Sequence, residues 1–205
     1  MRNARGAKSK PAGLKVNLRE AGLWTAGLLV ALVAFTLWAA REEQKASAKS
    51  RNWPEGAPLT LDPARLTLLL FVHPQCRGTE ATLQTLAHVM ERCAGHANVT
   101  IMMYEDPALL AHWKGSPIKS EAESIPGATV REDHLGAAAG FFNVSTSGCA
   151  LIFAPDGTLL YRGGITPALG QVGDGEVLQT WLLDGQGVRH EPTFGCSLQG
   201  IGDHS

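Results

Sequence analysis

The feature that most constrains this chain is an uncharged apolar run of twenty residues near its N-terminus, Ala21–Ala40. A helix of this length rises about 30 Å, which matches the hydrocarbon core of a membrane. Trp24 and Trp38 lie near its two ends, where indole rings favour the membrane interface. The run therefore predicts one transmembrane helix, and it leaves the rest of the 205-residue chain to form a separate folded domain.

The charge of the chain changes sign shortly after this run. Residues 1–51 carry ten Lys and Arg against three Glu, a net of +7, whereas residues 52–205 carry eight Lys and Arg against sixteen Asp and Glu, a net of −8. Basic residues that precede a membrane span stay on the cytoplasmic side. We therefore expect a basic cytoplasmic tail at residues 1–20 and a signal-anchor helix at 21–40, with no nucleic-acid partner. The domain that follows is expected on the opposite side of the membrane.

Two alternatives to an uncleaved anchor remain open. A cleaved signal peptide has a shorter apolar region and small residues at its cleavage site, whereas cleavage after Ala39 or Ala40 would place Leu37 or Trp38 at the −3 position. A buried helix of a soluble protein is the other alternative. Beyond the run, we expect a tether at residues 41–58, one domain at 59–198 and a short tail at 199–205.

The domain shows strand and helix patterns in alternation. The expected elements are strands at Arg65–Val72 and Val99–Tyr104, helices at Thr79–Cys93, Glu132–Phe142 and Gly175–Leu183, and a hairpin of Cys149–Phe153 with Thr158–Tyr161. Between them, Glu105–Arg131 contains three Pro and is expected to be an insertion with one or two short helices. This order predicts an α/β fold whose mixed sheet has a parallel β-α-β half and a C-terminal hairpin, flanked by helices.

The residue with the clearest chemical potential is Cys76, which follows the first strand at the expected first turn of a helix. Unpaired backbone N–H groups and the positive end of a helix stabilise a thiolate there and lower its pKa. A thiolate attacks disulfides and binds soft metals. His73 and Arg77 are close enough in sequence to add positive charge or a path for a proton.

Four short motifs connect this chain to a known family. They are His73-Pro74-Gln75-Cys76, Thr146-Ser147-Gly148, Gly163-Gly164-Ile165-Thr166 and Phe194-Gly195-Cys196. In their order and spacing the chain resembles the thioredoxin superfamily, in particular membrane-anchored periplasmic proteins of the TlpA/ResA type and the bacterial RedB-like group. The resemblance covers roughly residues 53–198. It implies a thioredoxin-like fold, redox chemistry at Cys76, and thiol or disulfide proteins as partners.

The chain departs from the thioredoxin pattern in two places. Thioredoxins have a second Cys three residues after the first, and here that position holds Thr79. They also have a cis-Pro before the hairpin, and here Gly148 or Cys149 falls at that place. In a thioredoxin-like fold Cys149 would therefore lie near Cys76 and could resolve its disulfides or share a ligand with it. Cys196 is the other candidate partner.

Several functions remain compatible with the sequence. The first is a membrane-anchored thiol–disulfide oxidoreductase with candidate residues Cys76, Cys149, Cys196, His73 and Thr79. The second is a non-catalytic binding protein on the same scaffold, for example one that holds copper(I) through Cys76 with Cys149 or His73, or a degenerate structural member. The cysteines could also form inert structural disulfides. The motif typical of thiol peroxidases is absent from this sequence. No cofactor is expected.

Overall fold

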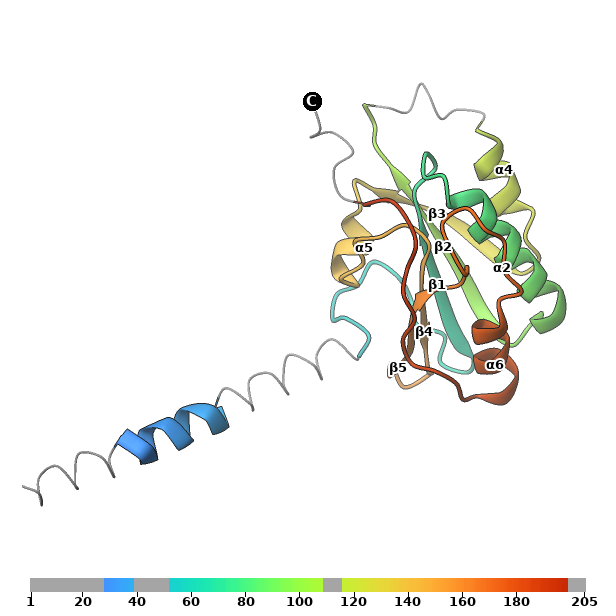
Figure 1. Cartoon of the computed structure of the whole chain (residues 1–205). Coiled ribbons are helices and arrows are strands. Elements are labelled where there is room, and N and C mark those ends of the chain that lie inside the picture. The colour runs from blue at the N-terminus through green and yellow to red at the C-terminus, as the bar shows by residue number, and fades with distance from the viewer. Residues whose placement is uncertain (1–27, 39–51, 109–115, 199–205) are drawn as a thin grey trace, which may run out of the picture. The chain divides into compact units, whose positions relative to one another are not determined.

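The structure of this chain is a computed structural model that describes residues 28–38, 52–108 and 116–198 (Figure 1). The chain divides into two units, Met1–Ala46 and Ser47–Ser205. In the first unit, residues 28–38 form a helix whose large apolar side chains are exposed. The rest of the segment 21–40, the tail 1–20, most of the tether and the tail 199–205 lie outside the described residues. Within the described part, no helix has both the length and the apolar character needed to cross a membrane.

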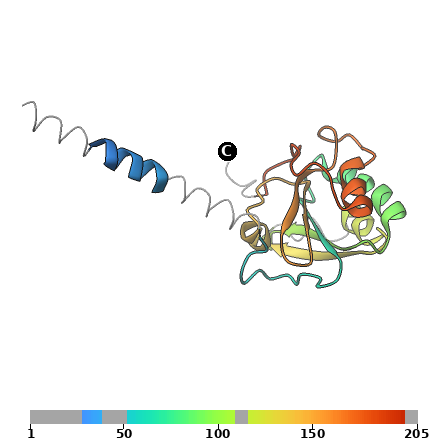
Figure 2. The same ribbon diagram turned by 90° about the horizontal axis from the view of Figure 1, so that it is seen from below.

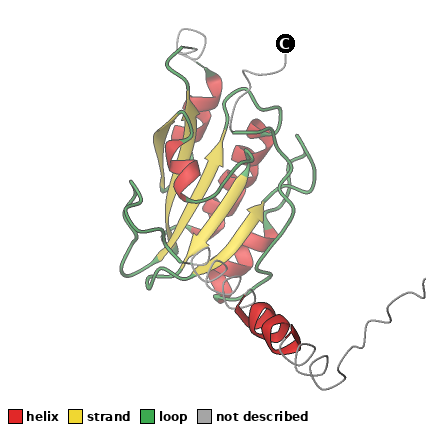
Figure 3. Ribbon diagram, turned by 90° about the vertical axis from the view of Figure 1, so that its left-hand side faces the viewer, coloured by secondary structure: helices red, strands yellow, loops and turns green. Residues whose placement is uncertain are grey.

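The second unit is built on one five-stranded sheet with the strand order β3-β2-β1-β4-β5 (Figure 3). The elements are β1 (Leu66–Val72), α2 (Thr79–Cys93), β2 (Ala97–Glu105), α4 (Pro117–Glu123), β3 (Ala128–His134), α5 (Ala137–Phe141), β4 (Cys149–Phe153), β5 (Leu159–Gly164) and α6 (Glu176–Asp184). The first three strands run parallel, whereas β4 is antiparallel to both β1 and β5. The predicted parallel half and C-terminal hairpin are therefore confirmed.

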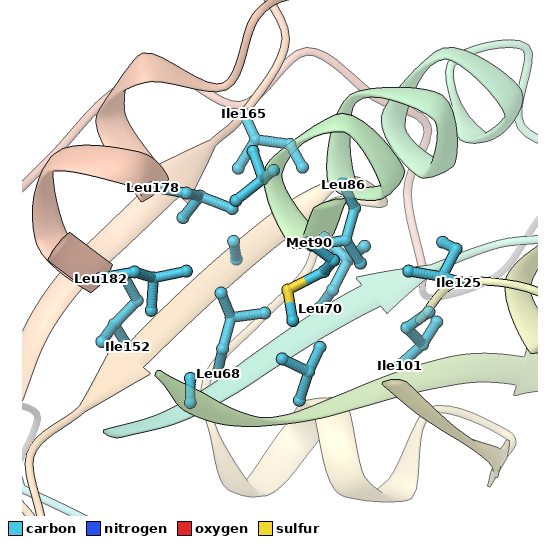
Figure 4. Close-up of a cluster of buried hydrophobic side chains, with 14 of the residues drawn as sticks. Leu68, Leu70, Leu86, Met90, Ile101, Ile125, Ile152, Ile165, Leu178 and Leu182 are labelled. Carbon is cyan, nitrogen blue, oxygen red and sulfur yellow. The ribbon is translucent and has the colours of Figure 1, made fainter. Parts of the chain in front are cut away.

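Helices cover both faces of this sheet because its central strand is apolar on both sides. Along β1, Leu68, Leu70 and Val72 pack into a core with α2 and α6, and the residues between them pack into a second core with α5. In Figure 4, Leu86 and Met90 of α2 point into the first core, where they meet side chains from the sheet. Figure 2 shows α2 and α6 together on one side of the sheet. This two-sided burial fixes β1, and with it the turn that begins after Val72.

The expected helix at Glu132–Phe142 is wrong in its first half. Residues Ala128–His134 instead form β3, which pairs in parallel with β2. Because β3 is an edge strand of the sheet, most of its side chains are exposed and polar, so the apolar alternation of a strand is absent. Leu135 and Gly136 then have positive φ and end the strand. The carboxylate of Asp133 accepts hydrogen bonds from the first N–H groups of α5, and the alanine run forms that short helix.

The chain returns along the sheet after α6, as the red segment in Figure 1 shows. The N–H of Arg162 in β5 donates to the carbonyl of Arg189, and the N–H of Glu191 donates back to the carbonyl of Arg162. The N–H of Gly164 donates to the carbonyl of Pro192. We call residues 189–198 the C-terminal strap. It continues past β5 toward the turn that carries Cys76.

Candidate functional site

Cys76 lies in the turn between the buried strand β1 and helix α2. The N–H of Cys76 donates to the carbonyl of His73 at 3.0 Å, and the N–H of Gln75 donates to Nδ1 of His73 at 3.1 Å. The N-cap of α2 is Gly78, so Cys76 lies two residues before the N-cap and not in the first turn of the helix as expected. The N–H of Gly78 nevertheless lowers the pKa of Cys76. The anticipated contact with the start of the helix is therefore made from just outside it.

Two hydroxyl groups hold this turn in place. The buried Ser147 Oγ accepts a hydrogen bond from the N–H of His73 at 2.9 Å. The hydroxyl of Thr79 donates to the carbonyl of His73 at 2.7 Å and lies 3.3 Å from Ser147 Oγ. Thr79 occupies the position of the missing second cysteine, and its hydroxyl braces the backbone of the turn. Ser147 belongs to the motif Thr146–Gly148, and no local sequence pattern indicates that its side chain lies beside this turn.

The C-terminal strap brings Cys196 onto Cys76. The N–H of Cys196 donates to the Cys76 sulfur at 3.1 Å, and the Cys196 thiol lowers the pKa of Cys76. The strap is held there by the loop that precedes β4, because the N–H of Ser147 donates to the carbonyl of Cys196 at 2.8 Å. The N–H of Leu198 donates to the carbonyl of Ser145 at the same distance. Of the two candidate partners of Cys76, Cys196 is the one the fold places against it.

Glycines allow the strap to approach this closely. A Cβ atom at Gly195 would overlap the carbonyl oxygen of Ser147. At Gly163 in β5, a Cβ atom would lie 2.5 Å from the carbonyl oxygen of Glu191. The motifs Thr146–Gly148, Gly163–Thr166 and Phe194–Cys196 therefore have a shared structural consequence: they let the strap lie on β5 and on the loop before β4, with Cys196 beside Cys76.

The two sulfur atoms have opposite electrostatic environments. Burial alone raises the pKa of Cys76, but hydrogen bonds from the Cys196 thiol, the N–H groups of Gly78 and Cys196, and the Ser147 hydroxyl outweigh it and hold the pKa below the usual thiol range. Burial raises the pKa of Cys196, and the adjacent Cys76 sulfur raises it further, against the N–H and charge of Arg77. Of the two thiols, Cys76 therefore loses its proton more readily than Cys196.

His73 has a structural place in this site. Its ring is buried, stacks on Tyr104 with ring centroids 4.8 Å apart, and accepts the hydrogen bond from Gln75. Burial lowers the pKa of His73, so the ring is neutral near pH 7. The positive charge expected from His73 is therefore absent at that pH, whereas the charge of the exposed Arg77 acts on Cys196.

Cys149 lies elsewhere. As the first residue of β4 it pairs with Phe71 of β1 and packs in the core on the α5 side of the sheet. Burial raises the pKa of Cys149, against the charge of Arg162 and a hydrogen bond from Thr193. Gly148 precedes β4, and no cis peptide bond occurs among the described residues. Cys93 is buried at the end of α2, where burial raises its pKa. All four cysteines are free thiols in this structure.

The copper hypothesis names Cys76 with Cys149 or His73 as the ligands. In the part of the chain that the structure describes, no group of three or more His, Cys, Asp and Glu side chains is placed to hold a metal ion. Nδ1 of His73, one of the proposed ligands, already accepts the N–H of Gln75. Cys76 and Cys196 remain as a pair of sulfur atoms in contact, and that pairing is the chemistry the site presents.

The fold and this turn define the class of protein. A mixed sheet with a parallel β-α-β half, an antiparallel hairpin, and a cysteine between the central strand and its helix is the thioredoxin-like arrangement. The fold is therefore α/β and thioredoxin-like, as the sequence resemblance implies.

Comparisons with known proteins agree on the fold and leave the activity open. No protein-family model matches the chain, and no curated protein does. A solved structure of a hypothetical protein from Sinorhizobium meliloti 1021 is similar with a TM-score of 0.58 at 17% identity, covering 74% of this chain and 96% of that one. The structure of an uncharacterized conserved protein from Geobacillus kaustophilus is similar with a TM-score of 0.56 at 18% identity, covering 68% of this chain and 79% of that one. The structure of a secreted Mycobacterium tuberculosis disulfide oxidoreductase homologous to E. coli DsbE has a TM-score of 0.47 at 15% identity, covering 65% of this chain and 94% of that one.

Proposed function

We propose that this protein is a thiol–disulfide oxidoreductase whose redox couple consists of Cys76 and Cys196. The couple passes between a dithiol and an internal disulfide, and it exchanges electrons with thiol or disulfide proteins. In this proposal Cys196, on the C-terminal strap, replaces the second cysteine that thioredoxins have beside the first one. The finer relation to the TlpA/ResA type and to the RedB-like group belongs to the same proposal.

One observation carries this proposal: the backbone N–H of Cys196 donates a hydrogen bond to the sulfur of Cys76 at 3.1 Å. Disulfide exchange needs a thiolate beside a second sulfur atom, and the pair supplies both. Hydrogen bonds to the Cys76 thiolate stabilise the reduced form. Stabilising the reduced form makes a disulfide more oxidising, as in strongly oxidising exchange proteins. We therefore expect the couple to be more oxidising than a pair of unperturbed thiols.

We also propose that residues 21–40 anchor the protein in the bacterial inner membrane as a single-pass helix. The N-terminus would be cytoplasmic and the domain periplasmic. The support is the uncharged run itself, the basic residues before it and the exposed apolar side chains along residues 28–38. An oxidising compartment suits a cysteine pair that must form and lose a disulfide.

The test is a redox titration of the full-length protein in detergent. We expect equilibration with glutathione buffers of increasing oxidised fraction to convert Cys76 and Cys196 together into one disulfide, located by mass spectrometry of non-reducing digests. Cys149 and Cys93 serve as internal controls and should stay reduced. If Cys76 and Cys196 stay unpaired in every buffer, the couple does not exist. If they stay linked even in fully reduced glutathione, the disulfide is structural and the proposed function is wrong.

A further inference from the structure

The two sulfur atoms of the couple differ in their access to solvent. Cys76 is only 6% exposed, whereas Cys196 is partly exposed. In thiol–disulfide exchange, the attacking thiolate must reach one particular sulfur atom. The strap that carries Cys196 covers Cys76, so an external thiol meets Cys196 first.

Hydrogen bonds hold the strap over Cys76 and so maintain the difference in solvent access between the two sulfur atoms. To uncover Cys76, the hydrogen bond from the Ser147 N–H to Cys196 and the one from the Leu198 N–H to Ser145 must both break. The bond from the Cys196 N–H to the Cys76 sulfur is lost as well. Opening of this kind is a local unfolding step that lowers the reaction rate of the covered group.

The surroundings of the two sulfur atoms also suit different roles. The N–H of Gly78 and the hydroxyl of Ser147 both lower the pKa of Cys76, so they can stabilise its thiolate as it leaves a disulfide. On the other side of the pair, the N–H of Arg77 hydrogen-bonds the Cys196 sulfur, and the Arg77 side chain is exposed. A positive charge next to Cys196 attracts an incoming thiolate.

We infer that Cys196 is the cysteine that exchanges with external thiols and disulfides, and that Cys76 is its internal partner; this rests on the proposed function. In the oxidised protein, a substrate thiolate attacks Cys196 Sγ, a bond forms between these two sulfur atoms, and the Cys76–Cys196 bond breaks. The electron pair of that bond stays on Cys76 as its thiolate. A second substrate thiolate then attacks the first substrate sulfur and releases Cys196, which takes a proton from water. Two thiols become one disulfide and the protein gains two electrons.

The experiment locates the first adduct. Full-length oxidised protein in detergent is mixed with reduced glutathione, quenched with acid at short times and mapped by mass spectrometry. We expect glutathione on Cys196, with Cys76 free. The reverse reaction compares two reduced variants with oxidised glutathione: Cys76→Ser keeps only Cys196 of the pair, and Cys196→Ser keeps only Cys76, under the strap. We expect Cys76→Ser to form the glutathione adduct about tenfold or more faster, because two backbone hydrogen bonds must break before glutathione reaches Cys76.

A variant that displaces the strap supplies the control. Gly195→Ala prevents the strap from packing against Ser147 and should make Cys76 accessible. Oxidised glutathione should then modify Cys76 as well as Cys196 in the reduced variant. An early adduct on Cys76 of the wild-type protein would overturn the inference while leaving the couple intact. Absence of any glutathione exchange, together with no Cys76–Cys196 disulfide in the redox titration, would instead remove the proposed function.

Discussion

The backbone N–H of Cys196 lies 3.1 Å from the sulfur of Cys76, although the two residues are 120 positions apart in the chain. In a Cys-x-x-Cys turn, a single helix start holds both sulfur atoms. Here the strap, β5 and the loop before β4 must all be in place before the second sulfur reaches the first. The proposed redox couple therefore depends on the complete fold, and we expect variants far from either cysteine to change it.

The first prediction concerns Ser147, whose hydroxyl accepts the N–H of His73 and hydrogen-bonds the Cys76 sulfur. Ser147→Ala leaves the buried His73 N–H without this acceptor, which should lower the free energy of unfolding by about 1–3 kcal/mol. It also removes one donor to the Cys76 thiolate, so the pKa of Cys76 should rise. Urea unfolding and thiolate absorbance measure the two effects.

The matched control for this variant is Ser145→Ala. Ser145 is two residues away and exposed, and its contact with the strap is made through its carbonyl oxygen, which the substitution keeps. We expect stability and the pKa of Cys76 to stay as in the wild type. Equal effects of both variants would show that the Ser147 hydroxyl has no specific role in the site.

The second prediction concerns the seat of the strap. Gly195→Ala places a Cβ atom against the carbonyl oxygen of Ser147, so the strap should shift although both cysteines are retained. Formation of the Cys76–Cys196 disulfide should slow by about tenfold or more, since the effective concentration of one thiol around the other falls. Gly140→Ala is the control, because a Cβ atom there meets nothing within 4 Å. If Gly195→Ala oxidises at the wild-type rate, the strap does not deliver Cys196 as described.

The parts of the fold that could be predicted from the sequence are those with strong local patterns. The helix Thr79–Cys93 was predicted with the bounds that the structure has, because its apolar residues recur at helical spacing. The strand β1 is a continuous apolar run and was also predicted, to within one residue. The edge strand β3 was missed because its exposed polar side chains give no such signal.

The partner of Cys76 could not be predicted, because it depends on contacts between distant segments. The choice between Cys149 and Cys196 requires the register of β4, which pairs Cys149 with Phe71 and places it on the α5 side of the sheet. It also requires the path of the strap, which has no periodic pattern. The motif Phe194–Cys196 indicates a role for this segment in the site. Its hydrogen bonds to Ser145 and Ser147, which hold Cys196 beside Cys76, are visible only in the structure.

The third prediction concerns Cys149. Its thiol packs in the core on the α5 side of the sheet, and burial raises its pKa, so it should take no part in exchange. Cys149→Ala removes one buried sulfur atom and should cost about 1 kcal/mol of stability. Glutathione titration should still convert Cys76 and Cys196 into a disulfide at the wild-type ratio. Loss of that disulfide in a folded Cys149→Ala protein would return Cys149 to the role of partner.

The fourth prediction concerns the pH dependence of the reduced site. The pKa of Cys76 lies below its ordinary value of 9.0, and the Cys196 thiol is the strongest of the hydrogen-bond donors that lower it. Cys196→Ala removes this donor and should shift the thiolate absorbance of Cys76 to higher pH, taken as the difference from the double variant Cys76→Ala/Cys196→Ala. Cys196→Ser keeps a hydroxyl donor and should shift it less.

The sign of the linked stability follows from the same pKa. Because the pKa of Cys76 is lower in the folded protein than in the unfolded chain, the hydrogen bonds to its thiolate stabilise the reduced protein fully above the unfolded value, and this stabilisation disappears as the pH falls through the folded value. Urea unfolding of the reduced protein should show a smaller gain between these two pH values in Cys196→Ala than in Cys196→Ser. Identical pH profiles for the two variants would mean that the Cys196 side chain does not stabilise the Cys76 thiolate.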